Sequence, residues 1–522
     1  MTRSKWLHIG DVLKMNAMNY PEKLGWQDRT KEFTFREWNL RACRFTNGLK
    51  DLGVGYKDRF AVMSYNRGEW MDIYAGCAKG GQVVVPILFR LAGPEIEYIV
   101  NHSECKGFIV EKPFVELVNS IKSKLNVPDD AYIYLGDGPA PPGYTDYENL
   151  LNSSSPNPPE RLIYGDDIWN IMYTSGTTGR PKGAVRTHES HIAHYVVSNI
   201  NMGVLPVDKV MLVMPMGHVN SIQYSFAYTL VSAPVFIYNM VSFDPEDLLK
   251  TIEKYQITFT SLVPTHYRMI LDLPVDLRGS IEVSSIRQLL ISSAPASKEL
   301  KIAIMNYFDN AELWEAYGST EGGICTLLRP EDQFRKLGSI GKEVFGTDQI
   351  KLLDEDRKEV ANGSIGELYY RGPSVFKEYF KDPEKTKEAF EGEWFSAGDM
   401  AKRDEDGYYY LVDRKANMII TGGENVYPSE VENVLKEHSG VKEVAVIGIP
   451  DEKWGEAIKA IVVLHNGYDP GPELAQEIKD FSRDKIAGYK RPKSIDFIEE
   501  EEIPRTPTGK ILHRVLRGMY TA

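Results

Sequence analysis

Short apolar runs alternating with amphipathic stretches are the feature that most limits how this chain of 522 residues folds. The runs FAVMS at 60–64, QVVVPIL at 82–88 and ITFTSLVP at 257–264 are almost continuously apolar, which is typical of strands covered on both faces. Segments with helical spacing separate such runs, for example 69–79 and 245–255. The alternation predicts an α/β fold with parallel sheets.

The apolar runs fall into two blocks, and the pattern of predicted secondary structure changes after the second block. A Ser/Pro-rich stretch at 152–159 lies between the blocks, so it is the predicted border between two α/β subdomains. From about residue 349 short strands and an Asn362-Gly363 turn predict hairpins. The last hundred or so residues return to mixed helices and strands and predict a compact C-terminal domain.

Composition and charge exclude several classes of protein. The chain has 61 Lys and Arg against 74 Asp and Glu, a net charge of −13, whereas nucleic-acid-binding domains usually carry a basic surplus. The first residues lack the apolar core of a signal peptide, and no window of about 18 apolar residues occurs. The cysteines form no Cys-x-x-Cys pair, which argues against a disulfide framework or zinc knuckle; they are Cys43, Cys77, Cys105 and Cys325. We therefore expect a cytoplasmic protein without a membrane segment or nucleic-acid partner.

The segment YTSGTTGRPKG at 173–183 is the most informative motif. Its glycines let backbone N–H groups approach an anion, its hydroxyls can donate to phosphate oxygens, and Lys182 adds a positive charge. The spacing differs from a Walker A loop, because Gly183 follows the lysine where Ser or Thr would stand. Taken alone, the segment is equally compatible with a flexible turn.

The full string resembles the phosphate loop of the adenylate-forming superfamily, which holds acyl- and aryl-CoA ligases, firefly-type luciferases and peptide-synthetase adenylation domains. Four further motifs follow in the order that the family shows: AYGSTE at 316–321, WFSAGD at 394–399, YLVDRKANMIITGGENVYPSEVE at 410–432 and PRTPTGKI at 504–511. The resemblance spans essentially the whole chain.

The resemblance implies a fold and a division into domains. It implies a large N-terminal domain of two doubly wound α/β subdomains plus a distorted β-barrel, at 1–413. A hinge at 414–416 and a small, mobile α+β C-terminal domain at 417–522 would follow. Many family members carry Asp or Lys at the hinge position where this chain has Ala416. The contacts of the hinge in its two orientations are therefore in doubt.

The resemblance also implies a reaction. A carboxylic acid and ATP would give an acyl-adenylate and pyrophosphate, and a thiol would then give a thioester and AMP. Because no carrier domain follows Ala522, the expected thiol is free coenzyme A. The implied cofactors are ATP/AMP, Mg²⁺ and coenzyme A. The alternatives are a luciferase-like oxygenase and an acyl-adenylate binder without catalytic activity. The second is disfavoured because Lys510, Glu321 and Asp399 are all present.

Residue roles follow from the motifs. The phosphate loop would hold the pyrophosphate through Thr174, Ser175, Gly176, Thr177, Thr178, Gly179 and Lys182. In the second motif Glu321 would coordinate Mg²⁺ and Thr320 would contact the α-phosphate, beside Ala316, Tyr317, Gly318 and Ser319. Tyr317 would stack on adenine, with Ser293, Ala294 and Pro295 on the other side. Asp399 would accept the ribose hydroxyls, with Arg414 nearby. The candidate catalytic residues are Lys510, Glu321, Thr174 and Thr320.

The C-terminal domain would present two different faces to the reaction. Lys510 would bridge the acid and the α-phosphate during adenylation. Gly422, Gly423 and Glu424 would line the path of the pantetheine arm. Tyr489 and Lys490, in the basic run YKRPK at 489–493, would meet the phosphates of coenzyme A or else form a solvated face.

The acid itself is left open by the sequence. Peptide-synthetase domains hold an ammonium with an aspartate where this chain has Val219, so an α-amino acid is a poor candidate. Small-acid synthetases often block their acyl pocket with a Trp where this chain has Gly318, which leaves space for a longer or cyclic acyl group. The strings VDRKANMI, GGENV and FKEYF also resemble crotonobetaine/carnitine-CoA ligases. Medium-chain, branched, aromatic and betaine acids remain, and the candidate pocket residues are His218, Val219, Tyr224, Thr265, His266, Gly318 and Gly323.

One histidine cluster competes for a functional role. His188, His191 and His194 recur every three residues, which could present metal ligands on one side of a helix. Because the family has a structural helix at this position, packing is the preferred interpretation.

Overall fold

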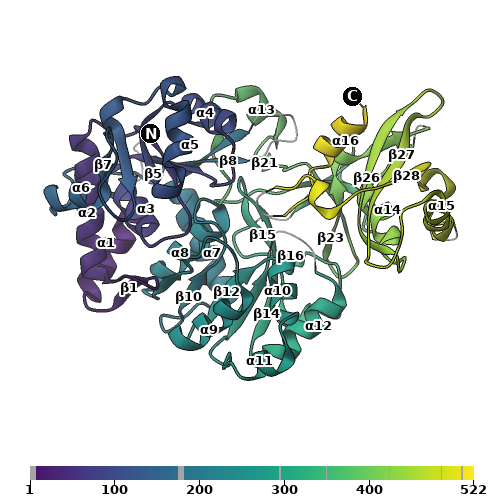
Figure 1. The fold of residues 1–522 in the computed structure, drawn as a ribbon, viewed down its shortest axis with the longest axis horizontal. Coiled ribbons are helices and arrows are strands. Elements are labelled where there is room, and N and C mark those ends of the chain that lie inside the picture. The colour runs from purple at the N-terminus through teal and green to yellow at the C-terminus, as the bar shows by residue number, and fades with distance from the viewer. Residues whose placement is uncertain are drawn as a thin grey trace. The chain divides into compact units, whose positions relative to one another are not determined.

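The computed structural model describes residues 8–174, 181–292, 296–347, 350–422, 424–483, 485–506 and 509–521. The chain divides into two compact units (Figure 1). The first comprises Met1–Gln349 and Tyr370–Phe395, and the second comprises Ile350–Tyr369 and Ser396–Ala522. The predicted hinge at 414–416 lies inside the second unit. The division by packing does not report which segment rotates, so the predicted domain borders stay a prediction.

The first sheet of unit 1 has the order β19-β9-β8-β4-β3-β5-β6-β7. Its strands β3 to β8 pair in parallel, whereas β9 and β19 add an antiparallel edge. Their bounds are β3 Arg59–Met63, β4 Val83–Ile87, β5 Cys105–Glu111, β6 Tyr132–Leu135, β7 Thr145–Asp146, β8 Ile168–Thr174, β9 Lys182–Thr187 and β19 Glu378–Tyr379.

The second sheet has the order β16-β15-β14-β13-β12-β10-β11-β1-β2. The strands from β14 to β1 in this order are parallel, and antiparallel strands stand at both edges. Their bounds are β1 Leu24–Gln27, β2 Glu32–Thr34, β10 Val210–Leu212, β11 Val235–Ile237, β12 Phe259–Leu262, β13 Gln288–Ile291, β14 Glu312–Ser319, β15 Gly323–Leu328 and β16 Lys342–Glu343.

The predicted border between the two subdomains is wrong. Strands β8 and β9 come after the Ser/Pro-rich stretch at 152–159, yet they join the first sheet, and the N-terminal hairpin of β1 and β2 joins the second. The chain passes from one sheet to the other between Thr187 and Val210. The stretch is a surface connection, and strand pairing over long separations cannot be read from local composition.

Helices cover both faces of each sheet in unit 1; for the second sheet, α9, α10 and α12 pack on one face, and α7 and α8 on the other, and Figure 1 shows α9 to α12 beside its strands. One apolar core between the sheets contains residues of α1, α2, α3, α7 and α8, and separate cores fill the outer faces. The helices are α1 Ile9–Asn19, α2 Phe35–Asp51, α3 Glu69–Gly80, α4 Gly93–His102, α5 Val115–Ile121, α6 Tyr147–Ser153, α7 His188–Met202, α8 Val219–Leu230, α9 Pro245–Tyr255, α10 Pro264–Leu271, α11 Val275–Gly279, α12 Lys298–Tyr307 and α13 Pro383–Glu388.

Two smaller antiparallel sheets follow along the chain. The predicted barrel region forms a four-stranded ladder, β17-β18-β22-β23, in unit 2, and β20 pairs with β21 in unit 1. The described strands thus make an open ladder in place of a closed barrel. The bounds are β17 Lys351–Leu353, β18 Gly366–Tyr369, β20 Phe390–Glu391, β21 Trp394–Phe395, β22 Asp399–Arg403 and β23 Tyr409–Arg414.

The rest of unit 2 is a five-stranded sheet with its own core under α14 and α15 and a smaller one under α16. The strands lie in the order β25-β24-β27-β26, and β28 pairs in parallel with β27. The bounds are β24 Ile419–Thr421, β25 Glu424–Val426, α14 Pro428–Leu435, β26 Val441–Asp451, β27 Gly455–Leu464, α15 Pro472–Phe481, β28 Ser494–Phe497 and α16 His513–Thr521.

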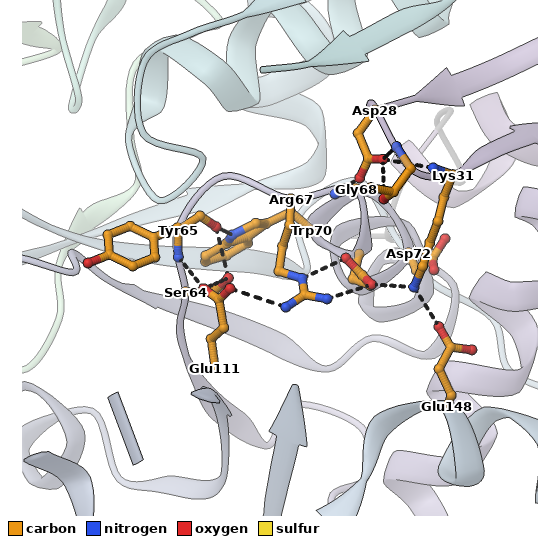
Figure 2. A network of polar contacts seen from close by, with 12 residues as sticks. Asp28, Lys31, Ser64, Tyr65, Arg67, Gly68, Trp70, Asp72, Glu111 and Glu148 are labelled. Carbon is orange, nitrogen blue, oxygen red and sulfur yellow. Dashed lines mark hydrogen bonds and ion pairs between the residues drawn. The ribbon is translucent and has the colours of Figure 1, made fainter. Parts of the chain in front are cut away.

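A network of charged side chains fills the carboxyl edge of the first sheet, beside β3 and β5 (Figure 2). Glu111, at the end of β5, accepts hydrogen bonds from Ser64 Oγ at 3.0 Å and Tyr65 N at 2.7 Å. Arg67 bonds to Glu111 at 3.2 Å and to both oxygens of Glu69. This edge is where doubly wound sheets often bind ligands, but here the side chains bind one another.

Candidate active site

Strands β8 and β9 flank the phosphate loop and fix where it begins and ends. Thr174, the last residue of β8, pairs with Lys182, the first of β9. The loop is therefore the connection of an antiparallel pair, with Thr174 and Lys182 at its base. The predicted loop residues Ser175, Gly176, Thr177, Thr178 and Gly179 lie outside the described residues, so their roles stay predictions.

The AYGSTE motif forms the turn of the hairpin between β14 and β15. Ala316, Tyr317, Gly318 and Ser319 end β14, with a register shift between Tyr317 and Gly318. Two hydrogen bonds close the turn from Thr320 to Gly322: Gly322 N donates to Ser319 Oγ at 2.9 Å, and Ser374 Oγ donates to Gly322 O at 3.0 Å. The motif is thus held from within and from residues 370–395.

Gly318 stands where two backbones approach closely. A Cβ at this position would lie 2.0 Å from the carbonyl oxygen of Gly323, so a larger residue would push the two strands apart. Gly323 has a φ of +72°, and a Cβ there would lie 3.0 Å from the ring of His194. These glycines therefore have a packing reason of their own, and their part in an acyl pocket stays a prediction.

Glu321 and Lys182, from distant motifs, are brought together on the side chain of Tyr379. The Tyr379 hydroxyl donates to Glu321 Oε1 at 2.9 Å, and Lys182 Nζ lies 4.2 Å from the centre of the Tyr379 ring. Glu321 is 8% exposed, and its second oxygen accepts no hydrogen bond from the part of the chain that the structure describes. Sequence reasoning missed Tyr379, although the aromatic segment FKEYF at 376–380 was noted for another reason.

Mg²⁺ fits this arrangement. It is usually held by one or two carboxylates together with substrate phosphates. One carboxylate oxygen of Glu321 would bind Mg²⁺, while the other accepts a hydrogen bond from the Tyr379 hydroxyl. No group of three or more His, Cys, Asp or Glu with metal-site geometry occurs among the described residues, so a metal bound by protein ligands alone has no support there.

Arg186 supports the backbone of the AYGSTE turn, and the sequence motifs did not predict it. Its guanidinium is fully buried and donates to Thr320 O at 2.7 Å and to Ser190 O at 3.4 Å. No carboxylate of the described residues lies within 4.0 Å of it. Burial lowers the pKa of Arg186 to about 10, against the opposing charge of Glu321. Burying a charged guanidinium costs free energy, and here its hydrogen bonds fix the backbone of the turn.

Asp399 and Arg414 face each other across β22 and β23. They are paired in register, and Arg414 Nε lies 2.7 Å from Asp399 Oδ1. Arg414 also donates to Ala397 O at 3.2 Å. Asp399 is 6% exposed, so its carboxylate is held in one orientation. The two predicted ribose contacts are therefore one pair.

Lys510 lies in a tight loop of unit 2, near that pair. Thr506 N donates to Lys510 O at 2.8 Å, and Lys510 N donates to Thr506 Oγ1 at 3.1 Å. Burial lowers the pKa of the Lys510 amine, as does the charge of Arg414, whereas Asp399 raises it. The residue as a whole is exposed.

Anchored neighbours surround the predicted hinge residue, Ala416. Lys415 Nζ pairs with Glu367 at 2.8 Å, and Lys415 N donates to Gly398 O at 2.8 Å. Asp413 accepts hydrogen bonds from Asn417 Nδ2 at 3.1 Å and from Ser429 N at 2.8 Å. These contacts hold the backbone on both sides of Ala416, and the hinge itself stays a prediction.

The predicted coenzyme A residues are separated into a turn and a basic segment. Gly422 has a φ of +62°, and a Cβ there would lie 2.8 Å from the ring of Trp454, an exposed residue that sequence reasoning missed. Gly423 lies outside the described residues, and Glu424 is exposed. Lys490 pairs with Glu430 at 2.6 Å, and Tyr489 is exposed. Lys490 would have to leave Glu430 to reach a phosphate.

The candidate acyl-pocket residues come mostly from one edge of the second sheet. His218 and Val219 begin α8 after β10, and Thr265 and His266 lie in α10 after β12. Because β10, β12, β13 and β14 are parallel neighbours, these positions share their carboxyl edge with Tyr317. Tyr224 instead lies in the core, 3% exposed and packed on Phe259.

A polar cluster lies at the same edge. Asn220 Nδ2 donates to Ser261 Oγ at 2.9 Å and to Ser292 Oγ at 3.3 Å. Ser292 directly precedes the predicted adenine slot, Ser293, Ala294 and Pro295, which lies outside the described residues. The cluster was not found from the sequence, because its members come from three separate elements.

The three histidines of α7 are packed in the core. His194 Nε2 accepts a hydrogen bond from Ile324 N at 2.8 Å, and His191 contacts Asn170 Nδ2 at 3.0 Å and the Tyr195 hydroxyl at 3.1 Å. His188 stacks on Trp169. Burial lowers the pKa of all three imidazoles. Their surroundings explain them as structural residues.

Comparison with known families agrees with this geometry. A family model described as AMP-binding enzyme matches residues 13–380, and one described as AMP-binding enzyme C-terminal domain matches residues 430–510. The chain therefore belongs to the AMP-binding enzyme family, and the resemblance identified from the motifs is confirmed. The predicted α/β fold class is confirmed as well.

Individual relatives cover nearly the whole chain. The long-chain-fatty-acid–CoA ligase FadD13 of Mycobacterium tuberculosis is 34% identical over 99% of both chains. The anthranilate CoA ligase AuaEII in complex with anthranoyl-AMP has a TM-score of 0.87 at 28% identity, covering 99% of this chain and 98% of that one. O-succinylbenzoate coenzyme A synthetase of Bacillus subtilis, in complex with ATP and magnesium ion, has a TM-score of 0.83 at 26% identity, covering 96% and 98%.

In the described part of the chain, no helix combines the length and the hydropathy that crossing a membrane requires.

Proposed function

We propose that this chain is an AMP-forming acid–CoA ligase, which converts a carboxylic acid and ATP to an acyl-adenylate and pyrophosphate and then transfers the acyl group to coenzyme A. The observation that carries the proposal is the meeting of Lys182, from the phosphate-loop motif, with Glu321, from the AYGSTE motif, on one tyrosine. The family membership and the three named relatives support it.

The chemistry explains why the described residues of the site supply charge. A carboxylic acid is already ionised at pH 7, so the first step needs no proton removed. It needs the negative charge of the triphosphate offset and the reactants held in line. Lys182 offsets charge at the base of the phosphate loop, and Mg²⁺ held by Glu321 would neutralise the leaving pyrophosphate.

The remaining roles are proposals at residue level. The Asp399–Arg414 pair would orient the ribose, because a carboxylate can accept two hydroxyl donors while Arg414 fixes its rotation. Lys510 would carry its positive charge to the acid and the α-phosphate. Thr320 would contact the α-phosphate, with its carbonyl held by Arg186.

The class of acid is a proposal that rests on relatives and on one position. The three relatives are named for a long-chain fatty acid, anthranilate and o-succinylbenzoate. Val219 offers no charge to an ammonium group. We therefore propose a long-chain or aryl acid without an α-amino group. The ligase would work in the cytoplasm, where thiols stay reduced, and its four cysteines are free.

A panel of acids tests the proposal. Purified protein is mixed with ATP, Mg²⁺ and palmitate, octanoate, ferulate, anthranilate, o-succinylbenzoate, carnitine or phenylalanine, with and without coenzyme A, and AMP and acyl-CoA are measured. We expect acyl-CoA formed in step with AMP for a long-chain or aryl acid. AMP release that needs oxygen and ignores coenzyme A would contradict the ligase, and preference for phenylalanine would contradict the acid class.

A further inference from the structure

Tyr379 is tied to two strands that carry different parts of the proposed site. It lies in β19, which pairs with β9, the strand that begins at Lys182. Phe380 N donates to Gly183 O at 2.7 Å, and Phe376 N donates to Glu321 O at 2.6 Å. The backbone from Phe376 to Phe380 therefore holds the phosphate-loop strand and the Glu321 turn together.

The side chain of Tyr379 contacts both of these parts. Its hydroxyl donates to Glu321 Oε1, and its ring face meets the ammonium of Lys182. The residue is 4% exposed and packs edge-on against Phe376, so the ring has little freedom. A cation over an aromatic face and a hydrogen bond to a carboxylate are both strengthened by such burial.

We propose that Tyr379 is a positioning residue that sets Glu321 for Mg²⁺ and Lys182 for phosphate; the inference rests on the proposed function. A free carboxylate has two equivalent oxygens and can rotate. The phenol hydrogen bond to Oε1 fixes the rotation of the carboxylate and leaves Oε2 as the oxygen that would bind the metal. The same ring holds the Lys182 ammonium at its face, so one side chain positions both charged groups.

The two contacts can be separated by substitution. Tyr379→Phe removes the hydroxyl and keeps the ring under Lys182. Tyr379→Leu removes both. If the proposal holds, the first variant weakens the effect of Mg²⁺ on ATP binding, and the second also weakens ATP binding when Mg²⁺ is absent.

The matched control is Tyr56→Phe. The Tyr56 hydroxyl donates to both oxygens of a buried carboxylate, Asp167, at 2.9 and 3.0 Å. Asp167 precedes β8, at the opposite end of this strand from Thr174. The control therefore removes the same kind of hydrogen bond from the same unit, about 23 Å from Thr174 along the strand at about 3.3 Å per residue.

Calorimetric titration with ATP, in Mg²⁺ and in EDTA, makes the test independent of the acid. For the wild type we expect Mg²⁺ to tighten ATP binding. For Tyr379→Phe the ratio of the two dissociation constants should fall about tenfold, the scale of losing one hydrogen bond to a charged group. The affinity in EDTA should stay within about twofold. Tyr379→Leu should lose about tenfold in EDTA as well, and Tyr56→Phe should match the wild type.

The outcomes distinguish this inference from the proposed function. An unchanged Mg²⁺ ratio in Tyr379→Phe, or an equal loss in Tyr56→Phe, would overturn the positioning role, whatever acid the enzyme uses. A melting temperature within a few degrees of wild type checks that the variants are folded. If ATP binds as expected but no acid yields AMP, the positioning role stands and the ligase proposal fails.

Discussion

At the scale of single residues, the structure adds positioning residues to those that the motifs contain. Motif positions such as Glu321 and Thr320 belong to one short string, whereas Arg186 and Tyr379 reach them from other strands. Each is buried and bonds to the motif through one defined atom. Their types, an arginine in a strand and a tyrosine in an aromatic segment, look like ordinary core residues in the sequence, so only the fold reveals their role.

Arg186→Met tests the support under Thr320. The variant loses the hydrogen bond to Thr320 O, so kcat/KM for ATP should fall about 10- to 100-fold, the scale of a misplacement near 1 Å. The melting temperature should change little, because removing a buried charge offsets the lost hydrogen bonds. Steady-state kinetics and thermal unfolding of the same sample measure both quantities. A large loss of stability with unchanged kcat/KM would mean that Arg186 is only structural.

At the scale of elements, the hairpin of β14 and β15 combines positions required by packing with residues of the proposed site. Its close approach at Gly318 needs a residue without a side chain, and its turn presents Thr320 and Glu321. Strand β14 ends the parallel run of the second sheet, β15 pairs with it in the antiparallel direction, and His194 and Arg186 bond to the backbone of this hairpin. Small changes in it should therefore affect stability and activity together.

Gly318→Ala should lower stability by about 1–3 kcal/mol, the range for overpacking a filled space. The reason is the 2.0 Å approach of the new Cβ to Gly323 O. Gly279→Ala is the matched control, since no atom lies within 4 Å of its Cβ and its φ is ordinary. Denaturant unfolding followed by fluorescence compares the two. Equal stabilities for both variants would show that the hairpin relaxes freely.

The charge network at the start of α3 has an expected pH signature. Burial opposes ionisation of Glu69, but Arg67 and Lys31 bind it and lower its pKa to about 2 from an ordinary 4.5. A lowered folded-state pKa contributes stability above pH 4.5, which is lost as the pH falls toward 2. Burial raises the pKa of Asp72 to about 6, despite Arg41, so its contribution has the opposite sign and is lost as the pH rises from 3.8 to 6.

Unfolding curves of the wild type and Glu69→Gln between pH 3 and pH 7 measure this effect. Glu69 should contribute about 2–3 kcal/mol at pH 7 that fades below pH 4.5. The variant should therefore lie below the wild type at pH 7 and converge with it on the acid side. Asp72→Asn should instead reduce the loss of folding stability that the wild type shows as the pH rises from 4 to 6. Parallel curves for the wild type and Glu69→Gln would contradict the assignment.

At the scale of the whole molecule, the proposed residue roles assign both half-reactions to one C-terminal segment. Lys510 is proposed for adenylation, and Gly422, Gly423 and Glu424 are proposed for the thiol. One face cannot serve both steps at once, so we propose that the segment after 414–416 rotates between them. The anchors at Asp413 and Lys415 would then be made and broken around Ala416.

Separate assays of the half-reactions test the two faces. Lys510→Ala should slow adenylation about 10²–10³-fold, the scale of one key electrostatic contact, and should still convert supplied acyl-adenylate and coenzyme A at a nearly normal rate. Gly423→Leu should show the reverse, because a side chain would obstruct the pantetheine path. Pyrophosphate release and thioester formation are the readouts. Equal damage to both steps in both variants would contradict the model of two faces.

The amino-acid sequence by itself determined the fold class, the family and the motifs. Buried parallel strands are read from local hydrophobicity, and a phosphate loop or an AYGSTE string is contiguous, so each needs no knowledge of distant contacts. The same locality explains the helices at 69–79 and 245–255, which are observed as α3 and α9. Capping and Pro at the first turn start α9, with Asp244 accepting a hydrogen bond from Asp247 N.

Only the tertiary structure decided which strands share a sheet and which residues of other strands contact each motif. Strands β8 and β9 joined the first sheet across the predicted border, because pairing is settled by which edges meet and not by the connecting residues. The contacts of Tyr379 with Lys182 and Glu321, and of Arg186 with Thr320, join residues far apart in sequence. A hydrogen bond depends on position and angle within a few tenths of an ångström, and that precision arises only when the whole core is packed.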